Sequence, residues 1–155
     1  MLENFTYDEI TIGQRATYSK TLSELDVALF AATSGDVNPV HLDEAYAATT
    51  PFQGRIAHGM WTGGLVSAAL AMKLPGPGTI YLNQSLKFTA PVRIGDALTV
   101  ELEVTAKRDD RKFVTLDCKV RNQNGKLVAS GVAEVIAPGD KLRLEEPALP
   151  RFTRA

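Results

Sequence analysis

The 155-residue chain has little of several features, and each shortage excludes a class of protein. Cys118 is the only cysteine, so the chain can form neither an internal disulfide nor a thiolate metal cluster. The formal net charge is −1, and no run of Lys or Arg is long enough to follow a phosphate backbone. Nucleic acid is therefore not an expected partner.

Membrane and secretion signals are also missing from the sequence. The longest apolar stretch, around Leu65 to Met72, is too short to span a bilayer. The acidic N-terminus has neither the basic region nor the apolar core of a secretion signal. We therefore expect a cytoplasmic protein without a membrane partner.

The composition that is present is that of an ordinary globular domain. Hydrophobic residues make up 45% of the chain and charged residues 23%. A chain of this length fits one domain and buries roughly two-thirds of the surface that its unfolded form exposes. We expect that domain over residues 1–138, followed by an extended tail over residues 139–155 that is interrupted by Pro147 and Pro150.

Two helix starts follow each other in the first third of the chain. Ser23 is the expected N-cap of a first helix, with an acidic residue at the capping-box position, and Gly35 is its expected stop. Asn38 and Pro39 suit the N-cap and first position of a second helix, which we expect to end near residues 49–51.

The third helix is expected over residues 59–73, where every side is apolar or small. A helix without a polar face is buried, and the Pro-Gly-Pro-Gly segment 75–78 ends it.

Beyond the third helix the period changes to two, which indicates strands with one buried face and one wet face. The expected inward residues are Ile80, Leu82, Leu86, Phe88, Leu98, Val100, Leu102, Val104, Val114, Leu116, Cys118 and Val120, and a last strand is expected near 127–136. Helices first and an antiparallel meander second are typical of the α+β class. The pattern predicts a single hot-dog fold, an antiparallel sheet wrapped around a buried central helix, with a free face or edge that invites a second copy.

Asp36 and His41 form the first candidate for chemistry. They flank Asn38-Pro39, which prevents one continuous helix, so the two side chains can converge. A helix N-terminus disfavours a positive charge on His41, and a neutral imidazole beside a carboxylate can activate water. The same residues also fit an ordinary Asx turn with His41 at the surface, and spacing alone favours this structural alternative.

A stripe of small residues on the third helix is the second candidate. Gly59, Gly63, Ser67 and Ala71 recur every four residues, and the free amides at the helix start could receive a thioester oxygen. The alternative is that small residues only let the sheet pack closely, and the pattern alone favours packing. His58, just before this helix, is more often a structural histidine than a catalyst.

Two motifs carry a resemblance to a known family. The segment 34–43, Ser-Gly-Asp-Val-Asn-Pro-Val-His-Leu-Asp, resembles the signature of the MaoC-like (R)-specific enoyl-CoA hydratases, and Ile-Ala-His-Gly-Met over 56–60 resembles that family's second motif. The similarity covers residues 11–138, including the strand segment 80–88. The length and the single-domain layout resemble the short bacterial members that link fatty-acid oxidation to polyhydroxyalkanoate synthesis.

The resemblance implies a site and a reaction. It implies Asp36 and His41 as the water-activating pair, Gly59 as a main-chain oxyanion donor and Ser67 as an active-site hydroxyl. It also implies a homodimer that converts trans-2-enoyl-CoA and water into (R)-3-hydroxyacyl-CoA. No metal or redox cofactor is expected for this reaction. Coenzyme A is part of the substrate and is not counted as a cofactor.

The acyl chain is expected to lie beside the small stripe. Leu65, Leu70 and Met72 are the candidates for its pocket, and the bulky Met60 and Trp61 predict a preference for short chains. Two alternatives stay open. An acyl-CoA thioesterase on the same fold would cleave the thioester, and a non-catalytic acyl-CoA-binding module would need no acid–base pair.

Overall fold

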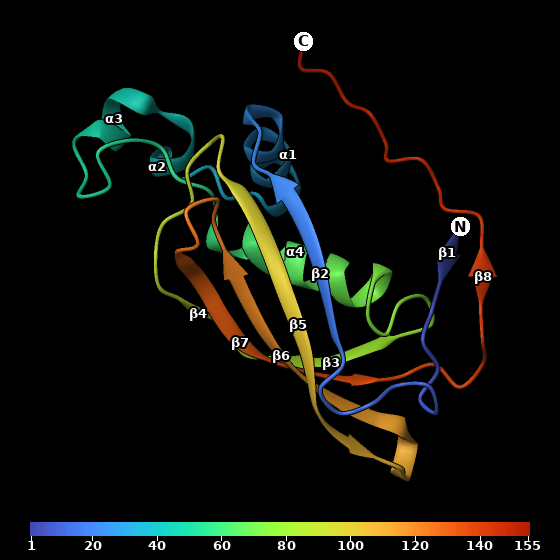
Figure 1. Ribbon diagram of the computed structural model, residues 1–155. Coiled ribbons are helices and arrows are strands. Elements are labelled where there is room, and N and C mark those ends of the chain that lie inside the picture. The colour runs from blue at the N-terminus through green and yellow to red at the C-terminus, as the bar shows by residue number, and fades with distance from the viewer.

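The computed structural model describes all of residues 1–155. A curved antiparallel sheet passes along one side of a central helix, α4 (Gly59–Met72), while α1 (Glu24–Ser34), α2 (Pro39–Leu42) and α3 (Glu44–Ala48) gather near the N-terminal end of α4 (Figure 1). The predicted α+β arrangement, a sheet wrapped around a central helix, is confirmed. None of the helices combines the length and the apolar character needed to cross a bilayer.

The main sheet has the strand order β2-β5-β6-β7-β3, with the short β4 also paired to β7. A separate two-stranded sheet joins the beginning of the chain to its later part. The strands are β1 (Leu2–Glu3), β2 (Arg15–Thr21), β3 (Ile80–Gln84), β4 (Lys87–Phe88), β5 (Ala97–Arg108), β6 (Phe113–Arg121), β7 (Leu127–Ile136) and β8 (Arg143–Leu144).

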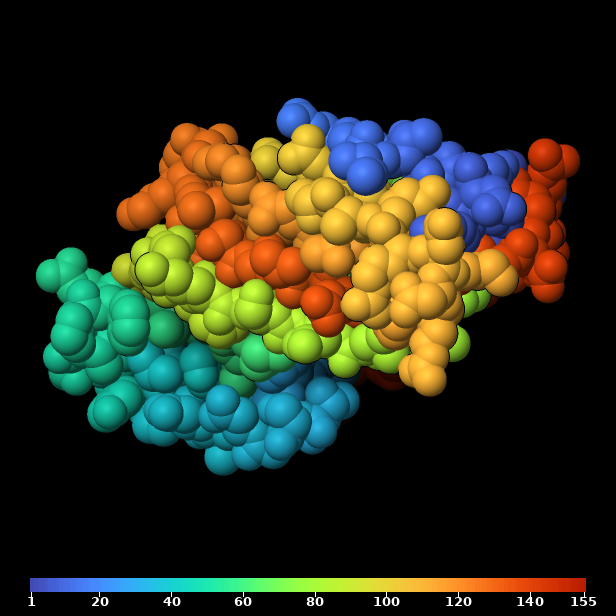
Figure 2. Space-filling model, turned by 90° about the horizontal axis from the view of Figure 1, so that it is seen from below, coloured from blue at the N-terminus to red at the C-terminus, as the bar shows by residue number.

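The alternation predicted for β5 and β6 is confirmed, because every predicted inward side chain of these two strands is buried. β3 differs. Ile80 is 54% exposed and Leu82 is 48% exposed, and Phe88 on the short β4 is also 48% exposed. The predicted burial of these three residues is wrong for the single chain. β3 pairs only with β7, and its register shifts between Tyr81 and Asn83. It is an edge strand, and Figure 2 shows the 80–88 segment at the surface beside β7.

The first helix follows the predicted signals. The Ser23 hydroxyl accepts a hydrogen bond from the Asp26 N–H at 3.1 Å, and the Asp26 carboxylate accepts one from the Ser23 N–H at 2.9 Å. Gly35 ends α1 with a φ of 81°, which glycine adopts without strain. The predicted capping box and C-terminal stop are both confirmed.

The second predicted helix is wrong in its length. Asn38 and Pro39 begin α2 as expected, but the helix ends at Leu42 and α3 starts directly afterwards. Asp43 separates them, because its side chain accepts a hydrogen bond from the Tyr46 N–H at 3.1 Å and so acts as the N-cap of α3. A short acidic side chain competes with the helical backbone in this way, and it breaks one helix into two.

The third predicted helix is confirmed in its bounds but not in its full burial. Its sheet-facing side packs into the core with Trp61, Leu65, Val66, Ala69 and Leu70. Its outer side carries Met60, Gly64 and Ala71, all of them exposed, and Met60 is 57% exposed. The outer side is apolar or small, yet no element of the same chain covers it.

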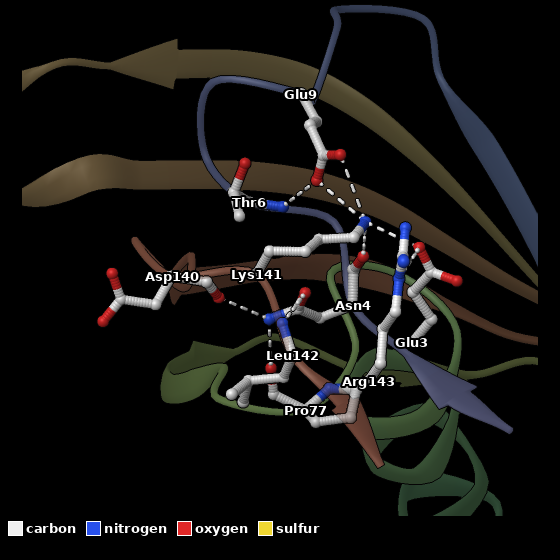
Figure 3. Close-up of polar contacts among 9 residues, drawn as sticks. All are labelled: Glu3, Asn4, Thr6, Glu9, Pro77, Asp140, Lys141, Leu142 and Arg143. Carbon is white, nitrogen blue, oxygen red and sulfur yellow. Dashed lines mark hydrogen bonds and ion pairs between the residues drawn. The ribbon is translucent and has the colours of Figure 1, made fainter.

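One buried side-chain amide, that of Asn4, stabilises the small β1–β8 sheet with its hydrogen bonds (Figure 3). Asn4 is fully buried, and its Nδ2 donates to the Pro77 carbonyl at 3.0 Å and to the Asp140 carbonyl at 2.9 Å. Its Oδ1 accepts from the Leu142 N–H at 3.0 Å. Lys141 adds ion pairs with Glu3 and Glu9. The expected tail of residues 139–155 therefore begins with paired structure, which ends with β8, and it has no helix or strand beyond residue 144.

Candidate active site

Asp36 and His41 are brought together by two consecutive turns. After Gly35 ends α1, the Oδ1 of Asp36 accepts a hydrogen bond from the Asn38 N–H at 3.1 Å, and Asn38 then caps the short helix that carries His41. The other carboxylate oxygen, Oδ2, lies 3.7 Å from Nε2 of His41. The Asx turn of the structural alternative is therefore present, because one oxygen of Asp36 accepts from the Asn38 N–H while the other faces the imidazole. The surface position that this alternative gave His41 is wrong, because His41 is buried.

The His41 ring is held so that its free nitrogen faces the carboxylate. Its side chain is buried, and Nδ1 lies 2.8 Å from the Ile56 carbonyl oxygen. A carbonyl only accepts hydrogen bonds, so Nδ1 carries the proton, and Nε2 of the neutral ring keeps its lone pair toward Asp36. Arg55 also fixes the main chain here, because its Nε donates to the His41 carbonyl at 2.7 Å.

His58 packs against this pair and also lines the cavity. Its ring stacks on that of His41 with 3.8 Å between centroids and 24° between planes, and Phe30 packs against it at 4.8 Å. Nε2 of His58 is 2.9 Å from the main-chain oxygen of Asp36. The histidine that the sequence favoured as structural therefore contacts both members of the candidate pair.

The same three residues are the candidate for a metal site. Ligand atoms of Asp36, His41 and His58 lie within 4.8 Å of one another. One nitrogen of each ring is already engaged with a main-chain carbonyl, and Nδ1 of His58 is buried without a hydrogen-bond partner.

A cavity of about 430 Å³ opens beside the pair. Its wall is mostly apolar and includes Phe52, Ile56, Phe88 and Val92, and His41 supplies a polar group. A mostly apolar cavity with few polar groups is the usual form of a small-molecule site.

Gly59 lies on the wall of the same cavity, at the first position of α4. The first amides of a helix lack intrahelical partners, so the Gly59 N–H is free to bind an oxygen. A Cβ at this position would lie 3.4 Å from the Phe88 ring, so the glycine keeps the space next to its amide open. The structure thus brings Gly59 to the same cavity as His41, with Asp36 next to that imidazole.

The other residues expected at the site do not line this cavity in one chain. Ser67 is half-buried, about 12 Å further along α4 by the rise of a helix. Leu65 and Leu70 are buried in the core between α4 and the sheet. Met72 borders a separate hollow near the N-terminus. The active-site hydroxyl role of Ser67 and the acyl-pocket roles of Leu65, Leu70 and Met72 stay predictions.

Two further observations concern residues outside the pair. Cys118 is buried on β6, and burial raises the pKa of its thiol to about 11, which suits an inert core residue rather than a nucleophile. Nothing in the local sequence marks Phe52, Val92 or the ring of Phe88 as cavity residues. The only signal was the place of Phe88 at the end of an alternating run, which does not say that it meets Gly59.

Comparisons with known proteins show the family of this chain. The family model described as "MaoC like domain" matches residues 8–124. The (R)-specific enoyl-CoA hydratase of Rhodospirillum rubrum is 52% identical over 134 residues, which cover 85% of this chain and 91% of that protein. The (R)-specific enoyl-CoA hydratase of Aeromonas caviae is 48% identical over 129 residues, which cover 83% of this chain and 96% of that protein.

Solved structures show the same similarity in three dimensions. The R-hydratase PhaJ1 from Pseudomonas aeruginosa has a TM-score of 0.94 and 53% identity over 99% of both chains. The (R)-hydratase from A. caviae involved in PHA biosynthesis has a TM-score of 0.80 and 48% identity, over 83% of this chain and 98% of that one. The matched segment contains Asp36, His41 and Gly59, and by sequence and fold alike the chain belongs to the MaoC-like family.

Proposed function

We propose that this protein is an (R)-specific enoyl-CoA hydratase, which adds water across the double bond of a trans-2-enoyl-CoA and forms (R)-3-hydroxyacyl-CoA. The observation that carries the proposal is the pair of Oδ2 of Asp36 and Nε2 of His41, 3.7 Å apart beside a cavity that also holds the Gly59 amide. The names of the relatives support the same reaction.

The pair is suited to hold one water molecule. Both facing atoms, the carboxylate oxygen and the unprotonated Nε2, are acceptors, so a water can donate one hydrogen to each. The lone pairs of the water oxygen then point away from the pair and toward the cavity. A substrate in that cavity presents its β carbon to a nucleophile that is already oriented.

The reaction follows from these positions. The water oxygen bonds to the β carbon, one of its protons goes to the Asp36–His41 pair, and the π electrons move to the thioester oxygen. The Gly59 N–H stabilises the resulting enolate, and such donors contribute roughly 3–4 kcal/mol. The pair then returns one proton to the α carbon. Since Nδ1 of His41 is held by Ile56, Nε2 is the ring atom that exchanges protons.

The charged part of coenzyme A fits the rim of the cavity. Phe52 borders both the cavity and a neighbouring surface hollow that contains Arg55 and Arg93. Arg55 is paired with Glu24 at 2.6 Å, whereas the Arg93 guanidinium donates to the Phe52 carbonyl. We assign Arg93 to a phosphate group of coenzyme A, because a guanidinium binds phosphate oxygens with two parallel hydrogen bonds.

A homodimer is part of the proposal. The strands β3 and β4 and the outer side of α4 expose Ile80, Leu82, Phe88 and Met60 on one chain. An unpaired apolar edge is a template for another strand, and a second copy would cover it. Sedimentation at micromolar concentration should give twice the chain mass, and a fully active monomer would contradict this assembly.

The biological role is proposed by the same reasoning. The A. caviae structure is described as involved in PHA biosynthesis, and we extend to this chain the supply of (R)-3-hydroxyacyl-CoA for polyhydroxyalkanoate synthesis. A cytoplasmic location belongs to this proposal, because acyl-CoA thioesters are intracellular metabolites.

One assay separates hydration from thioester cleavage. Crotonyl-CoA is incubated with the protein while the enoyl-thioester absorbance and the free thiol are measured together. We expect the absorbance to fall without release of free coenzyme A, and the product to be a substrate for an (R)-specific but not an (S)-specific 3-hydroxyacyl-CoA dehydrogenase. Release of one thiol per acyl group would instead establish a thioesterase, and binding without turnover would establish a non-catalytic module.

A further inference from the structure

The segment of four residues before α4, residues 55–58, forms hydrogen bonds with both members of the candidate acid–base pair. Arg55 donates to the His41 carbonyl at 2.7 Å, and Ile56 accepts from Nδ1 of His41 at 2.8 Å. His58 completes the set, with Nε2 at 2.9 Å from the Asp36 carbonyl oxygen. Segment 55–58 thus makes three side-chain hydrogen bonds to the pair.

The bond from His58 differs from the others because Asp36 has no second long-range restraint. The remaining hydrogen bonds of its loop are local. The Asp36 N–H donates to the Ser34 hydroxyl at 3.1 Å, and the Asn38 N–H donates to the Asp36 carboxylate at 3.1 Å. Asp36 itself is exposed. Its place relative to α4 therefore depends on the ring of His58.

The protonation of His58 follows from its contacts. The Asp36 carbonyl only accepts, so Nε2 of His58 carries the proton. Nδ1 is buried without a hydrogen-bond partner. The imidazole of His58 therefore makes one hydrogen bond, the one that Nε2 donates to the Asp36 carbonyl.

His58 also adjoins the other half of the proposed site. The peptide that follows it carries the Gly59 N–H, which lines the cavity. One residue thus holds the main chain of Asp36 through its side chain and positions the Gly59 amide through its backbone. His58 therefore links the main chain of Asp36 directly to the start of the helix that carries the Gly59 amide.

We propose that His58 is a positioning residue of the hydration reaction, which fixes Asp36 and the His41 ring relative to the Gly59 amide. This inference rests on the proposed hydratase function. His58 acts through Asp36 and His41 and exchanges no proton with the substrate. A displacement of about 1 Å at such a site can cost about a hundredfold in rate, so loss of the Asp36 restraint should lower kcat much more than it raises KM.

Three substitutions separate the hydrogen bond from the stacked ring. His58→Gln places an amide nitrogen near the former Nε2 and keeps a donor for the Asp36 carbonyl. His58→Asn has the same chemistry but is too short to reach it, so it is the matched control. His58→Phe keeps a ring against His41 and Phe30 and removes the donor.

The readouts are kcat and KM for crotonyl-CoA. Thermal melting gives the fraction of each variant that is folded, and kcat is calculated per folded enzyme. We expect His58→Asn and His58→Phe to lose at least about tenfold in kcat with KM within about threefold of wild type, and His58→Gln to recover most of that loss. If His58→Asn does not fold, the Gln and Phe variants decide. A Gln variant no faster than the Phe variant overturns the proposal.

A double variant tests whether His58 acts through Asp36. In the Asp36→Asn background, His58→Asn should lower kcat by little more, because the group it positions is already disabled. Losses that multiply would show an independent structural role and overturn the proposal. Unchanged kcat in folded single variants would do the same and leave the hydratase assignment intact. That assignment fails only if the wild-type protein does not hydrate crotonyl-CoA.

Discussion

Replacing Gly59 by alanine puts a methyl group at the first position of α4, between the free amide and the Phe88 ring. The new Cβ would lie 3.4 Å from two carbons of that ring, which is an ordinary van der Waals distance. Phe88 is partly exposed and can adjust. Alanine is also a better helix former than glycine, by about 1 kcal/mol in a helix interior and by less at the first position. The folded state should therefore be unchanged or slightly more stable.

The effect on activity should be the opposite. In the proposed mechanism a thioester oxygen binds the Gly59 N–H, and the methyl group would narrow the space next to that amide on the wall of a cavity of about 430 Å³. We expect kcat/KM for crotonyl-CoA to fall at least about tenfold, a loss of about 1.4 kcal/mol in transition-state stabilisation. A glycine needed only for helix packing would show activity that follows the folded fraction.

The assay is thermal melting beside crotonyl-CoA kinetics on the same preparation. Gly131→Ala is the control for a glycine required by packing, because its Cβ would lie 1.7 Å from the Ser85 carbonyl oxygen. That variant should be strongly destabilised. A stable Gly59→Ala protein with wild-type kinetics would refute the oxyanion role and leave the thioester carbonyl without a named donor.

Three other outcomes are expected. With crotonyl-CoA as substrate, Asp36→Asn and His41→Gln should each lower kcat by orders of magnitude in a folded protein. In the proposed mechanism both residues act on one water, so the loss of kcat in the double variant should be far smaller than the product of the two single losses. Arg93→Gln should raise KM for crotonyl-CoA severalfold but leave KM for crotonyl-pantetheine unchanged. The control variant Arg15→Gln, on the outer sheet face, should alter neither KM. An equal effect of Arg93→Gln on both substrates would contradict a role of Arg93 in phosphate binding. In a chain-length series, crotonyl-CoA should have a higher kcat/KM than enoyl-CoAs with eight or more acyl carbons, and the reverse order would contradict the short-chain expectation.

The parts of the fold that the sequence predicted well are determined within a few residues. The capping box at Ser23, the stop at Gly35 and the start at Pro39 each depend on a side chain and the backbone beside it. The alternation of β5 and β6 was equally readable, because both strands have one face in the core and one in water. Local chemistry is sufficient for such features.

The parts that were missed depend on contacts between distant segments. Nothing in the alternation of Ile80 and Leu82 says that β3 is an edge strand, because alternation reports two unlike faces and not what covers them. The contact of His58 with Asp36 joins residues 22 apart, so neither local sequence contains it. The candidate pair itself was predicted through the family motif, since spacing alone favoured the structural alternative.

The buried amide of Asn4 decides where this chain can be shortened. A cut after residue 138, at the end of the expected domain, would remove both the Asp140 carbonyl and the Leu142 N–H from that amide and leave only its bond to Pro77. An unsatisfied buried polar group costs about 1–3 kcal/mol, so such a truncation should lower the melting temperature. A cut after Leu144 keeps every partner, and the exposed residues 145–155 should be removable without loss of stability. A purification tag is for the same reason better attached to the C-terminus than close to Asn4.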